Sequence, residues 1–388
     1  MPVAEIITIG TEILLGEIID TNAQFIARKL RDAGIDLYRK TTVGDNTSRI
    51  ADAIRQALQR CDIVITTGGL GPTVDDPTRE AVAEAMDLEV EYRPELWDQI
   101  QSRFQRFGRL PTENNIRQAF VPAGATAITN PVGTAPAFIV NSGHCSVISL
   151  PGVPREMEYL LEQEVLPYLE MRFKNSGVIK ARTLHTVGIG ESQIDDLIGD
   201  LEKMSNPTVG LAAHTGQVDV RITAKAATVS EADLLISEIE GEIHQRLGDW
   251  IYGADQDSLV EIALDALRRK GWSLAVIEAG SDGELIRLLS ATNEAISPAE
   301  APVFQGGDIL QVLPAENEFL QVIKDYRKNH QVDVCLGVSI QPETERQVIH
   351  LVLMTPVSEI TLTRPYGGPA SYAPRWAIHH SLDLLRRL

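Results

Sequence analysis

A short segment near the N-terminus, Thr-Thr-Gly-Gly-Leu-Gly-Pro-Thr, holds residue types suited to binding a phosphate group. Its glycines are Gly68, Gly69 and Gly71, and without Cβ atoms they let backbone N–H groups approach an anion closely. The segment ends a strand predicted over 62–69 and precedes a predicted helix, whose N-terminal end adds positive potential. We therefore expect a phosphate-binding loop, although a glycine-rich turn alone has the same appearance. No Gly-Lys-Ser/Thr follows, which excludes a Walker loop.

Acidic side chains stand next to this loop. Asp75 and Asp76 follow it directly, and Asp45 lies in an earlier loop between a strand and a helix. Carboxylates beside a phosphate repel it unless a divalent cation lies between them, and Mg²⁺ often binds one or two carboxylates together with phosphate oxygens. The pattern therefore predicts a metal held by Asp45 and Asp76. The alternative is local, with Asp76 capping a helix that starts at Pro77 and Asp45 making an Asx turn, and the two interpretations are compatible.

Strands alternate with helices around these loops. The predicted elements are strands 3–9, 35–43 and 62–69, and helices capped by Asp20, by Thr47 or Ser48, and by Asp76. Such alternation favours a parallel sheet covered by helices on both faces, with ligands bound beyond the carboxyl ends of the strands. Further polar loops are expected at that edge, although each alone is typical of turns: Gly10-Thr11-Glu12, Asp20-Thr21-Asn22 and Gly133-Thr134-Ala135.

The chain of 388 residues is expected to form three domains. The first spans 1–173 and is followed by a linker at 174–177. A small α+β domain over 178–254 shows a strand, a helix, two strands and a helix. An α/β domain over 255–388 completes the chain.

Composition and charge exclude several classes of function. The 54 acidic and 35 basic side chains leave a net charge of −19, so nucleic-acid binding is not expected. No apolar run approaches the ~18 residues of a membrane span, and the N-terminus lacks the basic region of a signal peptide. Three widely spaced cysteines, Cys61, Cys145 and Cys335, favour the reducing cytoplasm.

Five segments of the first domain together resemble one family: ITIGTEILLGEIIDTNAQFIARKL, TTVGDN, TTGGLGPTVDDPTREAVAE, NPVGTAPAF and LPGVPREM. Their order and spacing are similar to the N-terminal domain of the competence/damage-inducible CinA family. The resemblance implies the three-layer α/β/α fold of molybdopterin-binding proteins. It also implies an ADP-ribose pyrophosphatase activity that depends on Mg²⁺, Mn²⁺ or Co²⁺ and releases AMP and ribose 5-phosphate. Leu70 departs from the pterin enzymes, which disfavours pterin chemistry.

The family pattern also implies roles for single residues. Asp45 and Asp76 match two functional aspartates, so both are expected to be catalytic and to hold the metal. Glu156 is expected to assist with metal or water, or else to stabilise the first turn of a helix over 155–170. The expected substrate-binding residues are Gly10, Thr11, Glu12, Asn22, Gly68, Gly69, Gly71, Thr73, Asn114, Gly133 and Thr134.

The middle domain resembles the KH-type module of the same family. A nucleic-acid-binding KH loop has the pattern GxxG and usually basic neighbours. Here Gly188-Ile189-Gly190-Glu191-Ser192 is acidic, and Glu191 or Ser192 is expected to cap a helix. We therefore expect a spacer or a dimer-forming element rather than an RNA-binding module.

The C-terminal domain resembles nicotinamide mononucleotide deamidases but departs from their motifs. Ala279 occupies the position of the serine nucleophile, and alanine has no oxygen with which to attack. Ser281 lies two positions later, where a helix cap is expected. The lysine segment and the glycine-rich loop of the deamidases are also missing, so we expect this domain to be inactive.

These observations leave hypotheses of different classes. The first is a metal-dependent hydrolase that acts on a nucleotide sugar of the ADP-ribose class in the first domain. The second is a noncatalytic sensor or scaffold that binds a nucleotide or a pterin. A third, adenylyl transfer to a pterin, is disfavoured by Leu70. In each case we expect a homodimer without membrane or nucleic-acid partners.

Overall fold

A computed structural model describes residues 2–106, 108–173, 177–296, 302–344 and 346–388. The chain forms two compact units, one of residues 1–180 and 225–233 and the other of 181–224 and 234–388, and each is described by itself. Most of the predicted linker, 174–176, lies outside the described residues. None of the helices in the described ranges is both long and apolar enough to traverse a lipid bilayer.

The first unit is built on a six-stranded sheet with the order β2-β1-β3-β8-β7-β6. The strands are β1 Val3–Ile9, β2 Asp36–Val43, β3 Ile63–Thr67, β6 Thr126–Ile128, β7 Ala137–Ser142 and β8 Cys145–Leu150. The first four in the order are parallel, as predicted, whereas β7 runs antiparallel to both of its neighbours, β8 and β6. The expected parallel sheet therefore contains one antiparallel strand, β7, because a tight turn joins β7 to β8 and brings Ser142 opposite Cys145.

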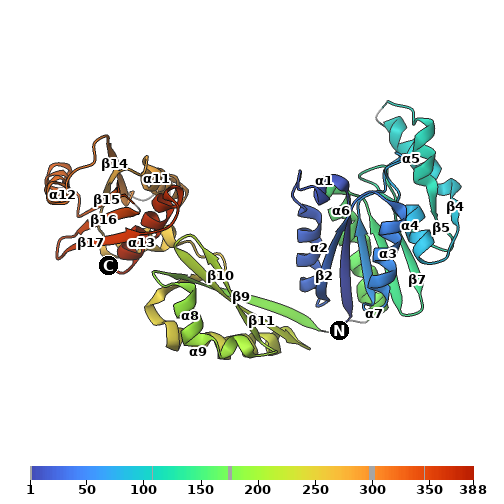
Figure 1. The fold of residues 1–388 in the computed structure, drawn as a ribbon, viewed down its shortest axis with the longest axis horizontal. Coiled ribbons are helices and arrows are strands. Elements are labelled where there is room, and N and C mark those ends of the chain that lie inside the picture. Colours follow the sequence, from blue (N-terminus) through green and yellow to red (C-terminus); the bar gives the residue numbers. More distant parts are fainter. Residues whose placement is uncertain (1, 107, 174–176, 297–301, 345) are drawn as a thin grey trace. The chain divides into compact units, whose positions relative to one another are not determined.

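Helices cover both faces of this sheet, as Figure 1 shows. They are α1 Thr11–Leu14, α2 Thr21–Asp32, α3 Thr47–Leu58, α4 Thr78–Ala85, α5 Pro94–Arg106, α6 Pro154–Leu160 and α7 Leu166–Phe173. Ile26 of α2 and Met157 of α6 pack with Ile6 and Ile65 on one face. The apolar sides of α3, α4 and α5 form the core on the other face. A short ribbon of β4 Val90–Tyr92 and β5 Phe120–Pro122 stands apart from the sheet. The predicted three-layer α/β/α arrangement is confirmed.

The helix caps agree only partly with the predictions. Asp20 caps α2, because its Oδ1 accepts the amide N–H of Ala23 at 2.9 Å. The cap of α3 is Asn46 rather than Thr47 or Ser48. Helix α4 begins at Thr78 with Pro77 as its N-cap, so the predicted cap at Asp76 is wrong. The physical reason is that the carboxylate of Asp76 turns back to Thr73 instead.

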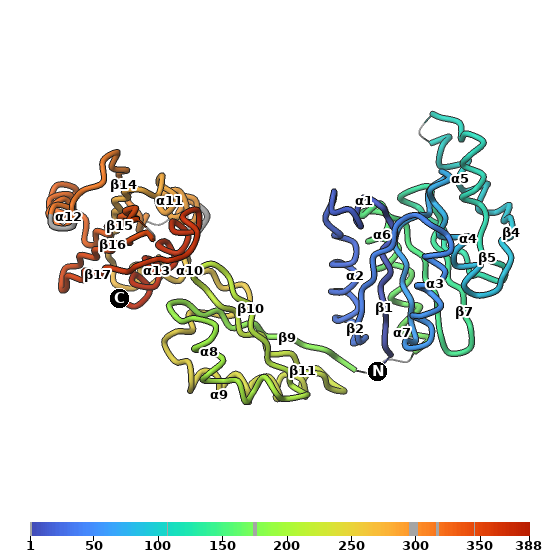
Figure 2. The backbone as a smooth tube through the Cα atoms, viewed as in Figure 1, coloured from blue at the N-terminus to red at the C-terminus, as the bar shows by residue number. Residues whose placement is uncertain are grey.

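A four-stranded sheet with the order β10-β11-β9-β12 forms the predicted small α+β domain. Its strands are β9 Val178–Val187, β10 Thr208–His214, β11 Gln217–Ala226 and β12 Ile251–Ala254, and its helices are α8 Glu191–Ile198 and α9 Val229–Leu247. Figure 2 shows β10, β11 and β9 as neighbouring segments. Helix α8 is capped by Gly190, so the expected caps at Glu191 and Ser192 are wrong; the main chain enters the helix one residue earlier.

The third sheet has the order β14-β13-β15-β16-β17. Its strands are β13 Leu274–Ala279, β14 Phe304–Leu310, β15 Val334–Pro342, β16 Gln347–Met354 and β17 Glu359–Tyr366. The helices are α10 Leu259–Lys270, α11 Glu284–Ile296, α12 Glu316–His330 and α13 Ala373–Arg386. Apolar residues of α10, α11 and α13 share one core with the sheet, while Phe319 and Ile323 of α12 belong to the core on its other face. This is the α/β domain predicted for the C-terminal part of the chain.

Candidate functional site

A pocket of about 450 Å³ lies in the first unit, beyond the carboxyl ends of β1, β3 and β8. The parallel register pairs Thr8 with Thr67 and Thr67 with Leu150, so the three strands end at the same level. The amide N–H of Gly68 then donates to the carbonyl oxygen of Leu150 at 3.1 Å, which joins two of the loops. The predicted meeting of polar loops at this edge is confirmed.

The glycine loop forms one wall of the pocket. Gly68 and Gly69 have φ of +108° and +65°, a region that favours glycine. A Cβ atom at Gly68 would lie 2.1 Å from the carbonyl oxygen of Ile9, and one at Gly71 would lie 2.3 Å from Oδ2 of Asp76. The backbone therefore requires glycine at Gly68 and Gly69, and a side chain at Gly71 would displace the carboxylate of Asp76. Within the described residues, the amide N–H groups of Gly69, Leu70 and Gly71 have no hydrogen-bond acceptor.

Asp45 and Asp76 both line this pocket, and each is held in the same way by a threonine. Oδ2 of Asp45 accepts hydrogen bonds from the amide N–H and the hydroxyl of Thr11, at 2.8 and 2.7 Å. Oδ2 of Asp76 likewise accepts from the amide N–H of Thr73, at 2.9 Å, and from its hydroxyl. Among the described residues, Oδ1 of either aspartate accepts no hydrogen bond, which leaves one oxygen of each carboxylate for a ligand.

Glu156 reaches the pocket from the first turn of α6. Its Oε2 accepts a hydrogen bond of 2.6 Å from Nδ2 of Asn130. Burial raises the pKa of the Glu156 carboxyl, while the hydrogen bond from Asn130 acts in the opposite direction. Glu156 is thus a half-buried carboxyl that takes up a proton more readily than an exposed one.

Asn22 contributes an acceptor to the pocket lining. Its side chain is 8% exposed, and Nδ2 donates to the hydroxyl of Thr67 at 3.0 Å and to the carbonyl of Gly152 at 2.8 Å. The buried Oδ1 has no hydrogen-bond partner in the part of the chain that the structure describes. Leaving such an oxygen unpaired is costly, so a ligand hydroxyl or N–H group that reaches it would be bound favourably.

Most of the predicted site residues come together here. The pocket is lined by Gly10, Glu12, Asn22, Asp45, Gly68, Gly69, Gly71, Asp76, Thr134 and Glu156. Thr11 and Thr73 hold the two aspartates, and Gly133 packs against Glu156.

Asn114 departs from its prediction. Its side chain is exposed and does not line the pocket. The segment that contains it forms a 3₁₀ helix, Glu113–Ala119, which presents Gln118 to the pocket instead. Gln118 is 1% exposed, and its Nε2 contacts the hydroxyl of Thr134 at 3.4 Å. The polar composition of the corner signalled a site, but not which residue reaches it.

The charges of the lining fit a divalent cation. The lining carries five carboxylates and, among the described residues, no lysine or arginine; the five are Glu12, Asp45, Asp75, Asp76 and Glu156. Within the described ranges, no three His, Cys, Asp or Glu side chains are placed to bind a metal by themselves. A cation held by Asp45 and Asp76 would therefore complete its shell with ligand oxygens and water, which is the habit of Mg²⁺.

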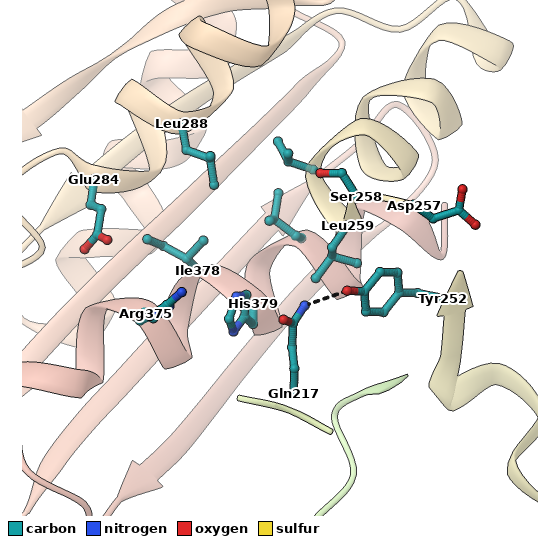
Figure 3. A pocket seen from close by; sticks show the side chains of 12 residues that line it. Gln217, Tyr252, Asp257, Ser258, Leu259, Glu284, Leu288, Arg375, Ile378 and His379 are labelled. Carbon is teal, nitrogen blue, oxygen red and sulfur yellow. Dashed lines mark hydrogen bonds between the residues drawn. The ribbon is translucent and has the colours of Figure 1, made fainter. Parts of the chain in front are cut away.

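A second pocket, of about 540 Å³, lies in the other unit (Figure 3). Its lining combines apolar side chains of α10, α11 and α13, such as Leu259, Leu288 and Ile378, with polar groups. On one side, Nε2 of Gln217 donates to the hydroxyl of Tyr252 at 3.0 Å. No residue predicted from the sequence as a site residue lines this pocket, and it contains no glycine loop.

The segment of the C-terminal domain for which the sequence suggested a resemblance to deamidases is buried. Ala279, at the end of β13, is fully buried. The hydroxyl of Ser281 donates to the carboxylate of Glu278, which is also fully buried. Helix α11 begins only at Glu284, so the predicted capping role of Ser281 is wrong; its hydroxyl is taken by Glu278.

Comparisons with known proteins agree with this architecture. Residues 5–171 match the family described as "Probable molybdopterin binding domain", and residues 181–253 match "Damage-inducible protein CinA KH domain". A CinA-like protein of Parasynechococcus marenigrum is 39% identical over 327 residues, which are 84% of this chain and 77% of that protein. A competence-damage inducible protein of Caldanaerobacter subterraneus subsp. tengcongensis is 37% identical over 371 residues, 95% of this chain and 86% of that one.

Among solved structures, a CinA protein of Thermoplasma acidophilum, described as of unknown function, is 37% identical with a TM-score of 0.40. It covers 44% of this chain and 96% of its own. The two matched domains stand in the order that the sequence predicts, and the relatives align over most of their length. The chain belongs to the CinA family, with a molybdopterin-binding-like first domain followed by a KH domain.

Proposed function

We propose that the first unit hydrolyses the phosphoanhydride of a nucleotide sugar of the ADP-ribose class, with a divalent cation as cofactor. The observation that carries this proposal is the lining of one pocket by both the glycine loop and the aspartates Asp45 and Asp76. Three amides of that loop have no acceptor among the residues that the structure describes. Amides bind phosphate oxygens, and carboxylates hold the cation that offsets their charge.

The charge balance favours a substrate with adjacent phosphates. Five carboxylates and no basic side chain among the described lining residues would repel a diphosphate on their own. When bound, Mg²⁺, Mn²⁺ or Co²⁺ supplies neutralisation of phosphate charge and a water of lowered pKa. The Oδ1 atoms of Asp45 and Asp76 would hold the ion, while Thr11 and Thr73 keep the carboxylates in place.

The chemical step is a displacement at phosphorus. The oxygen of a water molecule forms a bond to one phosphorus of the anhydride, and the bond from that phosphorus to the bridging oxygen breaks, which gives AMP and ribose 5-phosphate. Glu156 takes the proton of the water, because burial gives this carboxyl a raised pKa and so a greater affinity for a proton. The amides of the glycine loop stabilise the negative charge on the phosphate oxygens in the transition state.

The remaining walls suit the nucleoside part of the substrate. Ile13, Ile18 and Val153 line the pocket, and Ile18 and Val153 are 52% and 54% exposed, a surface that an adenine ring can cover. Oδ1 of Asn22, which has no hydrogen-bond partner in the described part of the chain, would accept a hydrogen bond from a ribose hydroxyl that reaches it.

The test uses the full-length protein, ADP-ribose and each of the three cations, with AMP release followed by chromatography. We expect turnover that needs the cation and falls at least a hundredfold in Asp45→Asn and in Asp76→Asn, since each loses a metal-binding charge. The matched control is Asp52→Asn, because Asp52 lies on the surface of α3 and pairs with Arg55. Nucleotide binding without turnover under all three cations would instead favour the sensor.

The homodimer is a proposal with its own test. Leu15 and Ile19 are 68% and 87% exposed, and apolar surface of this kind is common at interfaces. Light scattering should give twice the chain mass of 42.5 kDa. A mass of one chain at micromolar concentration would contradict the dimer.

A further inference from the structure

The carbonyl groups of the glycine loop are all held by the first two residues of α4. Gly68 accepts from the hydroxyl of Thr78 at 2.8 Å, and Gly69 accepts from the amide of Thr78 at 3.2 Å. Leu70 and Gly71 both accept from the guanidinium of Arg79, Gly71 at 3.1 Å. Four consecutive carbonyls therefore point toward the start of one helix.

The direction of the carbonyls determines the direction of the amides. In a trans peptide the C=O and the N–H point in opposite directions. The amides of Gly69, Leu70 and Gly71 belong to the same peptide groups as the carbonyls of Gly68, Gly69 and Leu70, so they point away from α4. These residues line the pocket and their amides have no acceptor among the described residues. The next residue is Pro72, which has no N–H. The loop therefore presents three successive N–H donors as an anion-binding concavity.

Arg79 is an unusual partner for neutral carbonyls, because it is 3% exposed and makes no ion pair within the described residues. Burial lowers its pKa to about 10, so it stays charged at neutral pH. Its Nε is buried without a hydrogen-bond partner in the described part of the chain. The negative charges of Glu80 and Asp76 favour its charged form, but neither carboxylate pairs with it directly. A ligand phosphate would therefore add stabilising negative charge near this buried cation.

We propose that Arg79 is a positioning residue for the phosphate of the ligand: it orients the amides of the glycine loop and places positive charge behind them. Arg79 does not line the pocket, so it acts through the loop rather than by touching the ligand. The inference rests on the proposed function only for the choice of a nucleotide as the ligand.

The test compares ligands with and without a phosphate. Binding of AMP, ADP-ribose and adenosine to the full chain is measured by calorimetry with Mg²⁺ present. We expect Arg79→Met to weaken AMP and ADP-ribose binding at least tenfold, because a charged group that orders three donors is lost. Adenosine affinity is expected to stay within twofold. The AMP affinity of Arg79→Lys is expected to lie between those of Arg79→Met and the wild type, since lysine restores the charge but cannot hydrogen-bond both carbonyls as arginine does.

The matched control is Arg55→Met, since Arg55 also donates to a main-chain carbonyl of α4, that of Glu84, at 2.9 Å, but away from the loop. Unchanged AMP affinity in Arg79→Met would overturn the proposal. An equal loss of affinity for AMP and for adenosine would also overturn it, because such a loss indicates a merely structural role for Arg79. If Arg79→Met does not fold, Thr78→Val is the second variant. It removes the hydroxyl that donates to the carbonyl of Gly68 and should weaken AMP binding more than adenosine binding. If the wild type hydrolyses no ADP-ribose but Arg79→Met still weakens AMP binding selectively, the proposed function is overturned and this inference stands.

Discussion

Gly133 lies directly against Glu156, so that a Cβ atom at position 133 would stand 1.9 Å from the carboxyl carbon of Glu156. Asn130 joins the two residues, because its Oδ1 accepts the amide of Gly133 at 2.8 Å while its Nδ2 donates to Glu156 at 2.6 Å. Asn130 is 2% exposed, so the bridge is shielded from water. The loop after β6 thus sets the position of a carboxyl that belongs to α6.

Gly133→Ala should therefore displace Glu156 from the pocket. Because Glu156 is the proposed proton acceptor, we expect kcat for ADP-ribose hydrolysis to fall at least tenfold while AMP binding changes little. Steady-state kinetics and calorimetry measure the two effects. Gly210→Ala is the control, since a Cβ atom there meets nothing within 4 Å. Equal kcat in Gly133→Ala and the wild type would remove Glu156 from the mechanism.

Thr11 and Thr73 should govern the affinity for the metal. Each hydroxyl donates to the carboxylate of a proposed metal ligand, Asp45 or Asp76. Removing a residue that orients a ligand typically costs about tenfold or more in metal affinity. We expect Thr11→Val and Thr73→Val to raise the half-saturating Mn²⁺ concentration about tenfold, with the maximal rate reduced less. Thr47→Val, two residues after Asp45, is the control. A metal titration that coincides with the wild type would show that the threonines do not support a metal site.

The edge of the first sheet could be predicted because its signals are local. Strands that alternate with helices form a parallel sheet, and the carboxyl ends of these strands lie at one edge. The glycine loop directly follows one of the strands. The hydrogen bond between Asp76 and Thr73 could not be predicted. An aspartate just before a helix can accept a hydrogen bond from the first turn of the helix or from the preceding loop, and the sequence does not distinguish the two. Arg79 gave no signal, since a basic residue in the first turn of an amphipathic helix usually faces solvent.

Side-chain direction explains the other differences. Asn114 and Gln118 lie in one 3₁₀ helix, and only its register decides that Gln118 is buried at the pocket. The antiparallel direction of β7 in the first sheet depends on the tight turn between β7 and β8, which a pattern of apolar runs does not distinguish from a crossover.

The stability of the protein should depend on the titration of Glu156. Its folded pKa is raised above the ordinary value of 4.5, so the folded state binds the proton more tightly than the unfolded state. The contribution of Glu156 to stability is therefore greatest below the ordinary pKa, falls as the pH rises through the raised folded pKa, and then levels off. Glu156→Gln removes this slope, whereas Glu158→Gln on the same helix should keep it. Unfolding by heat, followed from about pH 4 to pH 8, measures the difference. A Glu156→Gln variant that retains the full slope would assign the dependence to another group.

The C-terminal domain should not deamidate nicotinamide mononucleotide. Ala279 is fully buried and has no nucleophilic atom, and the hydroxyl of Ser281 is held by the carboxylate of Glu278. We expect the full-length protein to release no ammonia from this substrate above background, and Ala279→Ser alone to leave that result unchanged, since the lysine segment and glycine-rich loop are missing. Ammonia release that disappears in Ser281→Ala would contradict the prediction and identify Ser281 as a nucleophile that the hydrogen bond to Glu278 activates rather than restrains.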